Sequence, residues 1–360
     1  MPCLWGVSDK RTSLSDPRVC QIHPDERGMN LNQISTKGKR AMKAKAETEK
    51  SATAAGAFTG EKVEERIDSK KGLKDTLEHV MKAIFLVCGL VAIGFVLVIT
   101  VYLIVSGIPA IREVGLWNFL SGTDWHPNYK TDPAYGILPM ILTSIYGTCG
   151  AIIIGVPIGF LMAVYLSKVA PRRVAAVIRE VVDLLAGIPS VVYGLVGMMV
   201  LLPFIRETFN LPAGDTLFAA IIVLAIMILP SIISVSETAL NAVPREYEEA
   251  SLALGATELE TYFRVSAPAA KSGIAAAVVL GVGRAIGEAM AILMVAGNVA
   301  NMPSLLSSVK FLTTAIAGEM SYAGGLHRQA LFSIGLVLFV FIMLINAALN
   351  FFFKRDKEGN

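Results

Sequence analysis

Six long apolar runs constrain this chain more than any other feature of its sequence. Each is longer than the ~18 residues at which an apolar stretch becomes a candidate transmembrane helix. A backbone in lipid must satisfy its own hydrogen bonds, and a helix does so within one segment. The runs therefore predict an all-α membrane protein with six transmembrane helices, at Ala83–Val105, Ala134–Ser167, Leu184–Ile205, Thr216–Ser236, Gly273–Ala296 and Gln329–Phe353.

The composition agrees with a membrane protein and argues against other classes. Hydrophobic residues make up 54% of the chain and charged residues only 17%, whereas about a quarter of a soluble domain is charged. The formal net charge of +3 is too small for a nucleic-acid footprint. Cys3, Cys20, Cys88 and Cys149 have no metal-ligand spacing, so we expect four free thiols and no disulfide.

Four regions are expected along the chain. Residues 1–75 are polar and lack an apolar period, which predicts a disordered cytoplasmic tail. Residues 76–130 hold the first helix and an external loop, residues 131–353 the other five helices, and residues 354–360 a cytoplasmic tail. No apolar stretch follows Met1, so we expect no signal peptide; a start at Met29 or Met42 is an alternative.

The distribution of Lys and Arg predicts the orientation. These residues gather before the first run, between the second and third, between the fourth and fifth, and after the last, whereas the opposite connections hold only Arg112, Lys130, Arg206, Lys310 and Arg328. Positive loops face the cytoplasm, so both termini are expected there. Trp117, Trp125 and Tyr135 in the first external loop suit a membrane–water interface.

Residues 236–271 form a cytoplasmic loop that is far too long for a simple turn. Pro244 can occupy the first turn of a helix that runs to Leu254, and Gly255 can end it. Thr257 can cap a second helix that ends before Pro268, with Glu260 at capping-box distance. The loop then forms a knob of two helices. The alternative is an amphipathic pair that lies on the lipid surface.

The loop carries a motif that resembles the EAA signature of binding-protein-dependent ABC importer permeases. That signature is E-A-A, three residues, G, nine residues and I-x-L-P. Ser251, Val265 and Ala267 depart from it in this chain. The resemblance implies that the loop docks into a groove on a separate ATPase subunit. The residues that match or hold the motif positions are Glu249, Ala250, Ser251, Gly255 and Pro268.

Residues 75–353 also resemble the phosphate-specific permeases of the PstC type. The resemblance rests on AGIPSVVYG from Ala186, ILPSIISVSETAL from Ile228 and GRAIGEAMAILMVAGN from Gly283. It implies a type I ABC importer (MalF-like) permease fold, with residues 131–353 as the permease core, in a bacterial inner membrane. The implied partners are a homologous PstA-type permease, two copies of an ATP-binding subunit and an external phosphate-binding protein.

Arg284 and Glu288 interrupt the fifth apolar run. A charge at the centre of a membrane helix costs roughly 2.5–3.5 kcal/mol, so something must offset it. A spacing of four places both residues on one helix face, where they can neutralise each other. Arg suits phosphate because its planar fork meets two oxygens at once. We expect Arg284 to bind the anion and Glu288 to hold Arg284 between transits; a structural ion pair is the alternative.

The other motifs in the chain give weaker evidence about function. Gly283 and Gly287 form the G-x-x-x-G pattern of close helix packing, and the GxGxxxG spacing with no preceding strand does not match a dinucleotide fingerprint. No P-loop is present, and the four histidines are scattered. We therefore expect no cofactor, no metal and no enzymatic activity in this chain, with ATP hydrolysis left to a partner subunit.

Three readings of the function stay open from the sequence. The first is a permease subunit that imports inorganic phosphate, the second a permease for another oxyanion such as sulfate. The third is a secondary transporter or channel gated by the Arg284–Glu288 pair, which would work without a partner and would give the long cytoplasmic loop nothing to bind.

Overall fold

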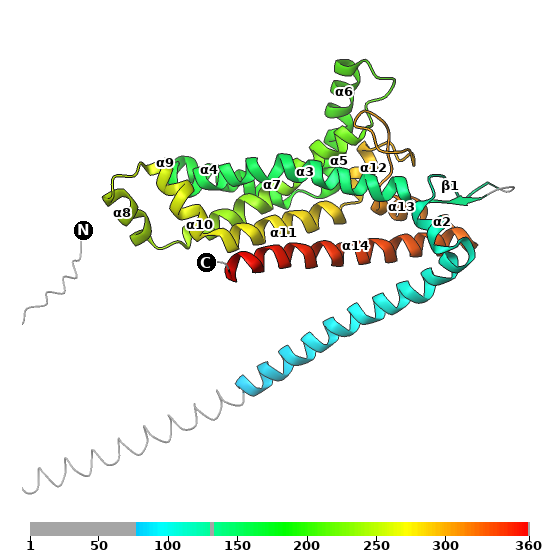
Figure 1. Cartoon of the computed structure of the whole chain (residues 1–360), viewed down its shortest axis with the longest axis horizontal. Helices are drawn as coiled ribbons and strands as arrows, with labels where there is room; N and C mark the ends of the chain where they lie inside the picture. The colour runs from blue at the N-terminus through cyan, green and yellow to red at the C-terminus, as the bar shows by residue number, and fades with distance from the viewer. Residues whose placement is uncertain (1–76, 130–132, 359–360) are drawn as a thin grey trace, which may run out of the picture. The chain divides into compact units, whose positions relative to one another are not determined.

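A computed structural model describes residues 77–129 and 133–358, which are almost entirely helical (Figure 1). The tail expected at residues 1–75 lies outside the described residues, as do Cys3 and Cys20. The chain divides after Leu90 into two compact units. Residues 77–90 of the first unit are helical, and the second unit, Val91–Asn360, contains the core.

The first helix is Leu77–Val114. A two-stranded sheet and a series of helices follow, three of them π-helical segments labelled η. In chain order these are α2 (Leu116–Ser121), β1 (Trp125–His126), β2 (Ala134–Tyr135), α3 (Leu138–Val164), η1 (Tyr165–Val169), α4 (Arg172–Gly187), α5 (Ser190–Val196), η2 (Gly197–Leu201), α6 (Leu202–Phe209), α7 (Leu217–Asn241), α8 (Arg245–Ala253), α9 (Glu258–Thr261), η3 (Tyr262–Ser266), α10 (Ala267–Ala269), α11 (Lys271–Gly287), α12 (Met290–Val295), α13 (Leu312–Glu319) and α14 (Gly325–Glu358).

Among the described residues, five helices are long and apolar enough to cross a membrane. A sixth span results if the bent pair Glu258–Ala269 and Lys271–Gly287, which meet at 74°, counts as one crossing. The predicted all-α membrane fold is confirmed. The span predicted at Ala83–Val105 lies within one helix, and the span predicted at Thr216–Ser236 does so except for Thr216, which is the N-cap of α7. The helix predicted from Gln329 begins four residues earlier, at Gly325, and α14 continues past Phe353 to Glu358.

The second span begins at Leu138 and not at Ala134, because Ala134 and Tyr135 pair antiparallel with His126 and Trp125. The rings of Trp125 and Tyr135 pack edge to face, with centroids 6.0 Å apart, and both residues are buried. These two side chains thus pack into the protein core and are not exposed to lipid, while their predicted level at a membrane–water interface stays a prediction. Trp117, in contrast, is 79% exposed.

The third predicted span is broken near its start, and the fifth is broken past its middle. In the third, α4 ends at Gly187, Ile188 is extended, and α5 begins at Ser190. Pro189 explains this break, since proline lacks an N–H and disfavours helical geometry in the residue before it. In the fifth, α11 ends at Gly287 and Glu288 is extended, with φ −73° and ψ 131°.

Helix α7 is the centre of the core and packs along α3. Leu224, Ile228 and Ile232 on α7 are almost fully buried. Glycines of α3 face them: a Cβ at Gly155 would lie 2.8 Å from Ile228 Cδ1, and one at Gly159 would lie 2.8 Å from Ile232 Cγ2. Small residues at these positions let the two backbones approach closely, as membrane helices require.

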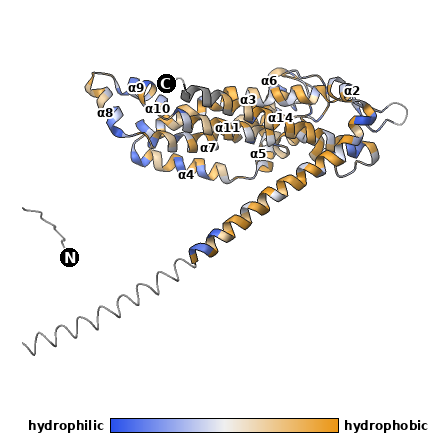
Figure 2. Ribbon diagram, turned by 60° about the horizontal axis from the view of Figure 1, so that its bottom comes forward, coloured by the Kyte–Doolittle hydropathy of each residue, from blue (hydrophilic) through white to orange (hydrophobic). Residues whose placement is uncertain are grey.

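Within the second unit, α8 and α9 lie at one end and β1, α2 and α13 at the other (Figure 1). Hydrophobic residues run along α3, α7, α11 and α14 between these ends, and hydrophilic turns gather at α8, at α9 and along part of α4 (Figure 2). We call the two ends the α8 end and the α2 end. Residues 236–241 of the predicted loop belong to α7, and this polarity places the remainder, residues 242–271, away from the apolar middle.

Candidate functional site

Arg284 lies in the last turn of α11, at the level where that helix breaks. Its Nη1 donates to Ser231 Oγ of α7 at 3.1 Å. The phenol of Tyr193 on α5 is within electrostatic range of the guanidinium, and its hydroxyl donates to the Leu185 carbonyl oxygen at 2.6 Å. Three helices thus converge on a half-buried cation.

Glu288 is only 9% exposed and does not pair with Arg284. Its Oε1 accepts a hydrogen bond from the Ala291 backbone N–H at 2.9 Å, and its carbonyl oxygen accepts one from Thr313 Oγ1 at 2.7 Å. The carboxylate therefore provides a hydrogen-bond acceptor for a backbone N–H in the first turn of α12. The prediction that Arg284 and Glu288 share a helix face is wrong, because the helix ends between them.

The helix break answers how the apolar run tolerates two charges. The carbonyl end of a helix stabilises a cation and the N–H end an anion. Arg284 lies at the carbonyl end of α11, and Glu288 lies at the N–H end of α12. Each charge is thus stabilised by a helix end and not by the other charge.

The short helices that follow the two breaks pack against each other. A Cβ at Gly194 of α5 would lie 2.9 Å from Ala291 Cα of α12. Close packing in the fifth span also involves Gly281, where a Cβ would lie 3.1 Å from Ile232 Cδ1. Gly283 and Gly287, in contrast, are exposed and have no atom within 4 Å of a Cβ position. The predicted packing at these two glycines does not occur against any described residue of this chain.

The guanidinium keeps its other N–H groups without a hydrogen-bond partner among the described residues. An Arg with open donors at a helix break, beside a face without side chains at Gly283 and Gly287, can accept an anion. No group of three or more His, Cys, Asp or Glu in residues 77–129 and 133–358 could hold a metal ion.

The second predicted site is the loop at the α8 end. Pro244 is the N-cap of α8, and Gly255 follows the helix with φ +89°, a backbone conformation that favours glycine. Thr257 and Glu260 form the predicted capping box. The prediction that the second helix ends before Pro268 is wrong. The helical path shifts to π geometry in η3 and continues into α10, where Pro268 occupies the first turn and needs no N–H bond.

The EAA-like residues lie on the outside of this loop. Glu249 and Ala250 are exposed, whereas Ser251 is half-buried and its Oγ lies 2.9 Å from Thr261 Oγ1. Leu254, just before the turn, is 91% exposed, and α8 has no buried residue. An exposed helix that ends in an exposed leucine is suited to insertion into a groove on another protein.

Sequence reasoning missed a buried ionic cluster at the α2 end. Glu319 forms an ion pair with Lys310, shares a hydrogen bond with His327 Nε2 at 2.8 Å, and accepts a hydrogen bond from Trp125 Nε1 at 3.2 Å. Burial by itself raises the pKa of this carboxyl. The hydrogen bond and positive charge of Lys310, together with the hydrogen bonds from His327 and Trp125, outweigh burial and lower the pKa of Glu319. Lys310 and His327 lie within nine residues of Glu319 but outside its helix α13, and Trp125 is 194 residues away, so no periodic pattern in the sequence reveals the cluster.

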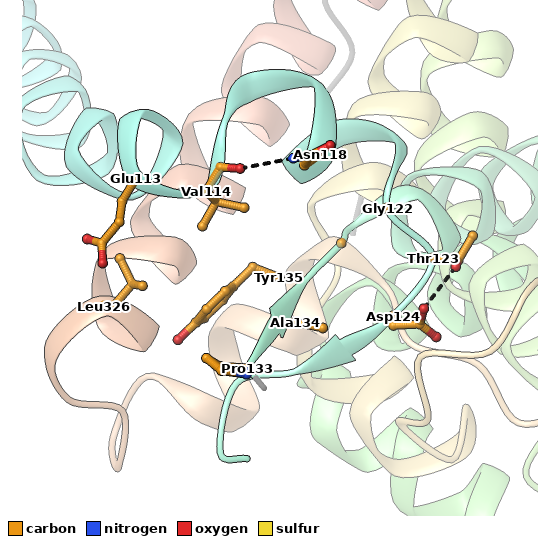
Figure 3. A pocket seen from close by; sticks show the side chains of 11 residues that line it. Glu113, Val114, Asn118, Gly122, Thr123, Asp124, Pro133, Ala134, Tyr135 and Leu326 are labelled. Carbon is orange, nitrogen blue, oxygen red and sulfur yellow. Dashed lines mark hydrogen bonds between the residues drawn. The ribbon is translucent and has the colours of Figure 1, made fainter. Parts of the chain in front are cut away.

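An open pocket of about 440 Å³ lies at the same end. Figure 3 shows the Tyr135 ring extending from β2 toward Leu326, whereas Thr123 and Asp124 lie beyond Gly122, on the other side of the strand. Burial, and then the charge of Glu113, raise the pKa of the Tyr135 hydroxyl, which keeps it neutral. Among the described residues, the pocket lining thus presents two carboxylates, from Glu113 and Asp124, and no cationic side chain.

Comparison with known proteins agrees with this architecture. Residues 155–356 match the family described as binding-protein-dependent transport system inner membrane component. The chain is 39% identical over 292 residues to the probable ABC transporter permease protein YqgH of Bacillus subtilis (strain 168), a match that covers 79% of this chain and 94% of that protein.

The names of two further relatives state a transported substrate. The phosphate transport system permease protein PstC of Haemophilus influenzae is 36% identical over 69% of this chain and 84% of that protein, and PstC of Pasteurella multocida is 32% identical over 72% and 90%. Among solved structures, the MetNI methionine ABC transporter in an inward-facing conformation covers 61% of this chain and 94% of its own, with 21% identity and a TM-score of 0.46.

Proposed function

Because this chain belongs to the binding-protein-dependent transport system inner membrane component family, we propose that it is the subunit through which an ATP-driven importer moves inorganic phosphate into the cell. The chain is an integral multi-pass permease of the bacterial inner membrane and is not itself an enzyme. The observation that supports phosphate as the substrate is the sequence identity of 32–36% with permeases named for phosphate, over 69–72% of this chain.

Arg284 is the proposed contact for the anion in the membrane. Its open N–H groups can meet two phosphate oxygens at once, and it stays charged at any working pH. Ser231 holds the guanidinium in place through the bond at 3.1 Å. Glu288 contributes by stabilising the break between α11 and α12, because its carboxylate accepts a hydrogen bond from the Ala291 N–H in the first turn of α12. The break keeps Arg284 at the end of α11. The negative charge of Glu288 near the path also disfavours permanent capture of the anion.

The loop at the α8 end is the proposed coupling element. Glu249, Ala250, Ser251, Gly255 and Pro268 form or support a knob that docks on a separate ATP-hydrolysing subunit, present in two copies. Lys and Arg concentrate at this end, which supports a cytoplasmic position for it and for both termini. Closure of the two ATPases would draw the knobs together and rock the helices between inward-open and outward-open states, the alternating access of transporters.

Two other partners complete the proposed assembly. A homologous permease of the PstA type would cover the open face at Gly283 and Gly287, where this chain has no side chain of its own. An external phosphate-binding protein would deliver the anion at the α2 end.

The test is uptake of radiolabelled phosphate by cells that carry the full complex, with unlabelled phosphate or sulfate as competitor. We expect phosphate alone to compete, and Arg284→Gln to abolish uptake while the complex stays at its normal level in the membrane. Equal competition by sulfate would instead indicate a general oxyanion permease. Unchanged uptake in both Arg284→Gln and Glu288→Gln would contradict the pathway, and transport by this chain alone in liposomes would contradict the dependence on an ATPase.

A further inference from the structure

Among the described residues, an ion pair ties the α8 helix to the membrane-spanning helices. Lys168 Nζ lies 2.6 Å from Glu248 Oε1, and the side chains are only 11% and 18% exposed. Lys168 belongs to η1, the π-helical last turn of the span that begins as α3. Glu248 belongs to α8. The pair therefore joins the loop directly to a transmembrane helix.

The same carboxylate oxygen also holds the segment that leads into α11. Ser266 Oγ donates to Glu248 Oε1 at 2.8 Å, and Ser266 is fully buried at the end of η3. The Tyr262 hydroxyl of η3 donates in turn to the Lys168 carbonyl oxygen at 3.4 Å. Two π-helical segments, η1 and η3, thus meet at Glu248.

Glu248 differs in this respect from the other acidic residues of α8. Glu246 and Glu249 are exposed and have no ion-pair partner among the described residues. Side chains on α8 thus divide into an outward set, which includes the EAA-like Glu249, and a single inward carboxylate. A force on the outward set can reach the membrane-spanning helices through these inward contacts, in addition to the short backbone link between Asn241 of α7 and Arg245 of α8.

From η1 the connection continues into the core. Arg179 of α4 donates to the Leu166 carbonyl oxygen in η1 at 3.4 Å, and its Nη2 lies 2.6 Å from Glu237 Oε1 on α7. A displacement of Lys168 can therefore reach α3, α4 and α7. A π segment is suited to such a displacement, because it interrupts the regular i→i−4 bonding and is often found at functional sites.

On the basis of the proposed function, we infer that the Lys168–Glu248 pair is a positioning element that converts motion of α8 into motion of α3 and α11. The pair is mostly buried, so its attraction is less screened than that of a surface pair. Loss of either charge leaves the other uncompensated in a dry setting. The knob can then still dock on the ATPase, but its movement is transmitted poorly.

The experiment compares phosphate uptake with ATP hydrolysis by the complete complex in proteoliposomes. The variants are Lys168→Gln, Glu248→Gln and the charge swap Lys168→Glu with Glu248→Lys. Arg173→Gln is the matched control, because Arg173 is exposed near Lys168 and has no ion-pair partner among the described residues. Ser266→Ala, which removes one hydrogen bond and no charge, is a milder variant.

We expect each single charge variant to lower the number of phosphate ions imported per ATP hydrolysed by about fivefold or more, the low end of coupling between two sites. Assembly and ATP hydrolysis should persist, and the charge swap should recover at least half of the ratio. Ser266→Ala should lower it less, and Arg173→Gln not at all.

Several outcomes overturn the inference. An unchanged ratio in both single variants does so, and so does a charge swap that recovers nothing. Loss of the complex from the membrane in both single variants, together with a normal ratio in Ser266→Ala, indicates a purely structural contact and also overturns it. A wild-type complex that hydrolyses ATP but imports no phosphate contradicts the proposed function instead.

Discussion

Arg284 on α11 donates to the hydroxyl of Ser231 on α7 at 3.1 Å, which joins the two helices beside a helix break. The serine follows Pro230 within α7. The bond fixes the direction of the guanidinium and is, among the described residues, the only hydrogen bond of that side chain. If the guanidinium carries phosphate, the serine sets the geometry of the anion contact.

We expect Ser231→Ala to reduce phosphate uptake about fivefold, because loss of this bond costs about 1 kcal/mol. The loss should appear as a higher KM, since the charge of Arg284 remains while its orientation is less fixed. Ser234→Ala is the control, because Ser234 is exposed on the same helix and its side chain makes no hydrogen bond to a described residue. Equal uptake by the two variants would show that Ser231 does not position Arg284.

The Glu319 cluster gives a prediction about stability and pH. The pKa of Glu319 is lower in the folded protein than its ordinary value of 4.5, so the ionised carboxylate stabilises the fold. That contribution is complete above about pH 4.5 and is lost as the pH falls through the lowered pKa. The melting temperature of the purified protein in detergent should therefore fall with acidification below this pH.

Glu319→Gln is the variant that isolates this effect. It should already melt several degrees lower at neutral pH, because Lys310 loses its buried partner. Its melting temperature should then respond less to acidification than that of the wild type. Parallel curves for the two proteins between pH 3 and pH 7 would contradict a role for this carboxylate.

The sequence predicted some parts of the site and not others, for physical reasons. Pro244, Gly255 and the Thr257–Glu260 box are local signals, because each acts on its own turn of backbone, and the structure confirms them. The break at Glu288 has no such signal: hydropathy averages over a window, and no proline precedes it. The Lys168–Glu248 pair joins residues distant in sequence, so only the folded chain reveals it.

The turn after α8 gives a prediction about coupling. Gly255 has φ +89°, a value that costs a β-branched residue of the order of 1–3 kcal/mol. Gly255→Val should therefore displace Leu254 and α9 and reduce co-purification of the ATPase subunit, while insertion of the chain into the membrane is unchanged. Gly255→Asn is the matched variant, because Asn tolerates positive φ better, and it should retain more of the ATPase. Full co-purification with Gly255→Val would contradict docking through this turn.

Gly283 gives a prediction about the partner permease. The position of a Cβ at Gly283 meets no atom of this chain within 4 Å, so a larger side chain does not clash within the subunit. If a second permease packs there, Gly283→Leu separates the two backbones, because close approach at a G-x-x-x-G face depends on small residues. We expect the variant to insert and fold normally but to recover much less of the partner permease on purification. Gly94→Leu is the control, since Gly94 on the first helix also meets no atom within 4 Å. Equal recovery of the partner in both variants would mean that this face contacts lipid and that the two glycines do not mark the interface.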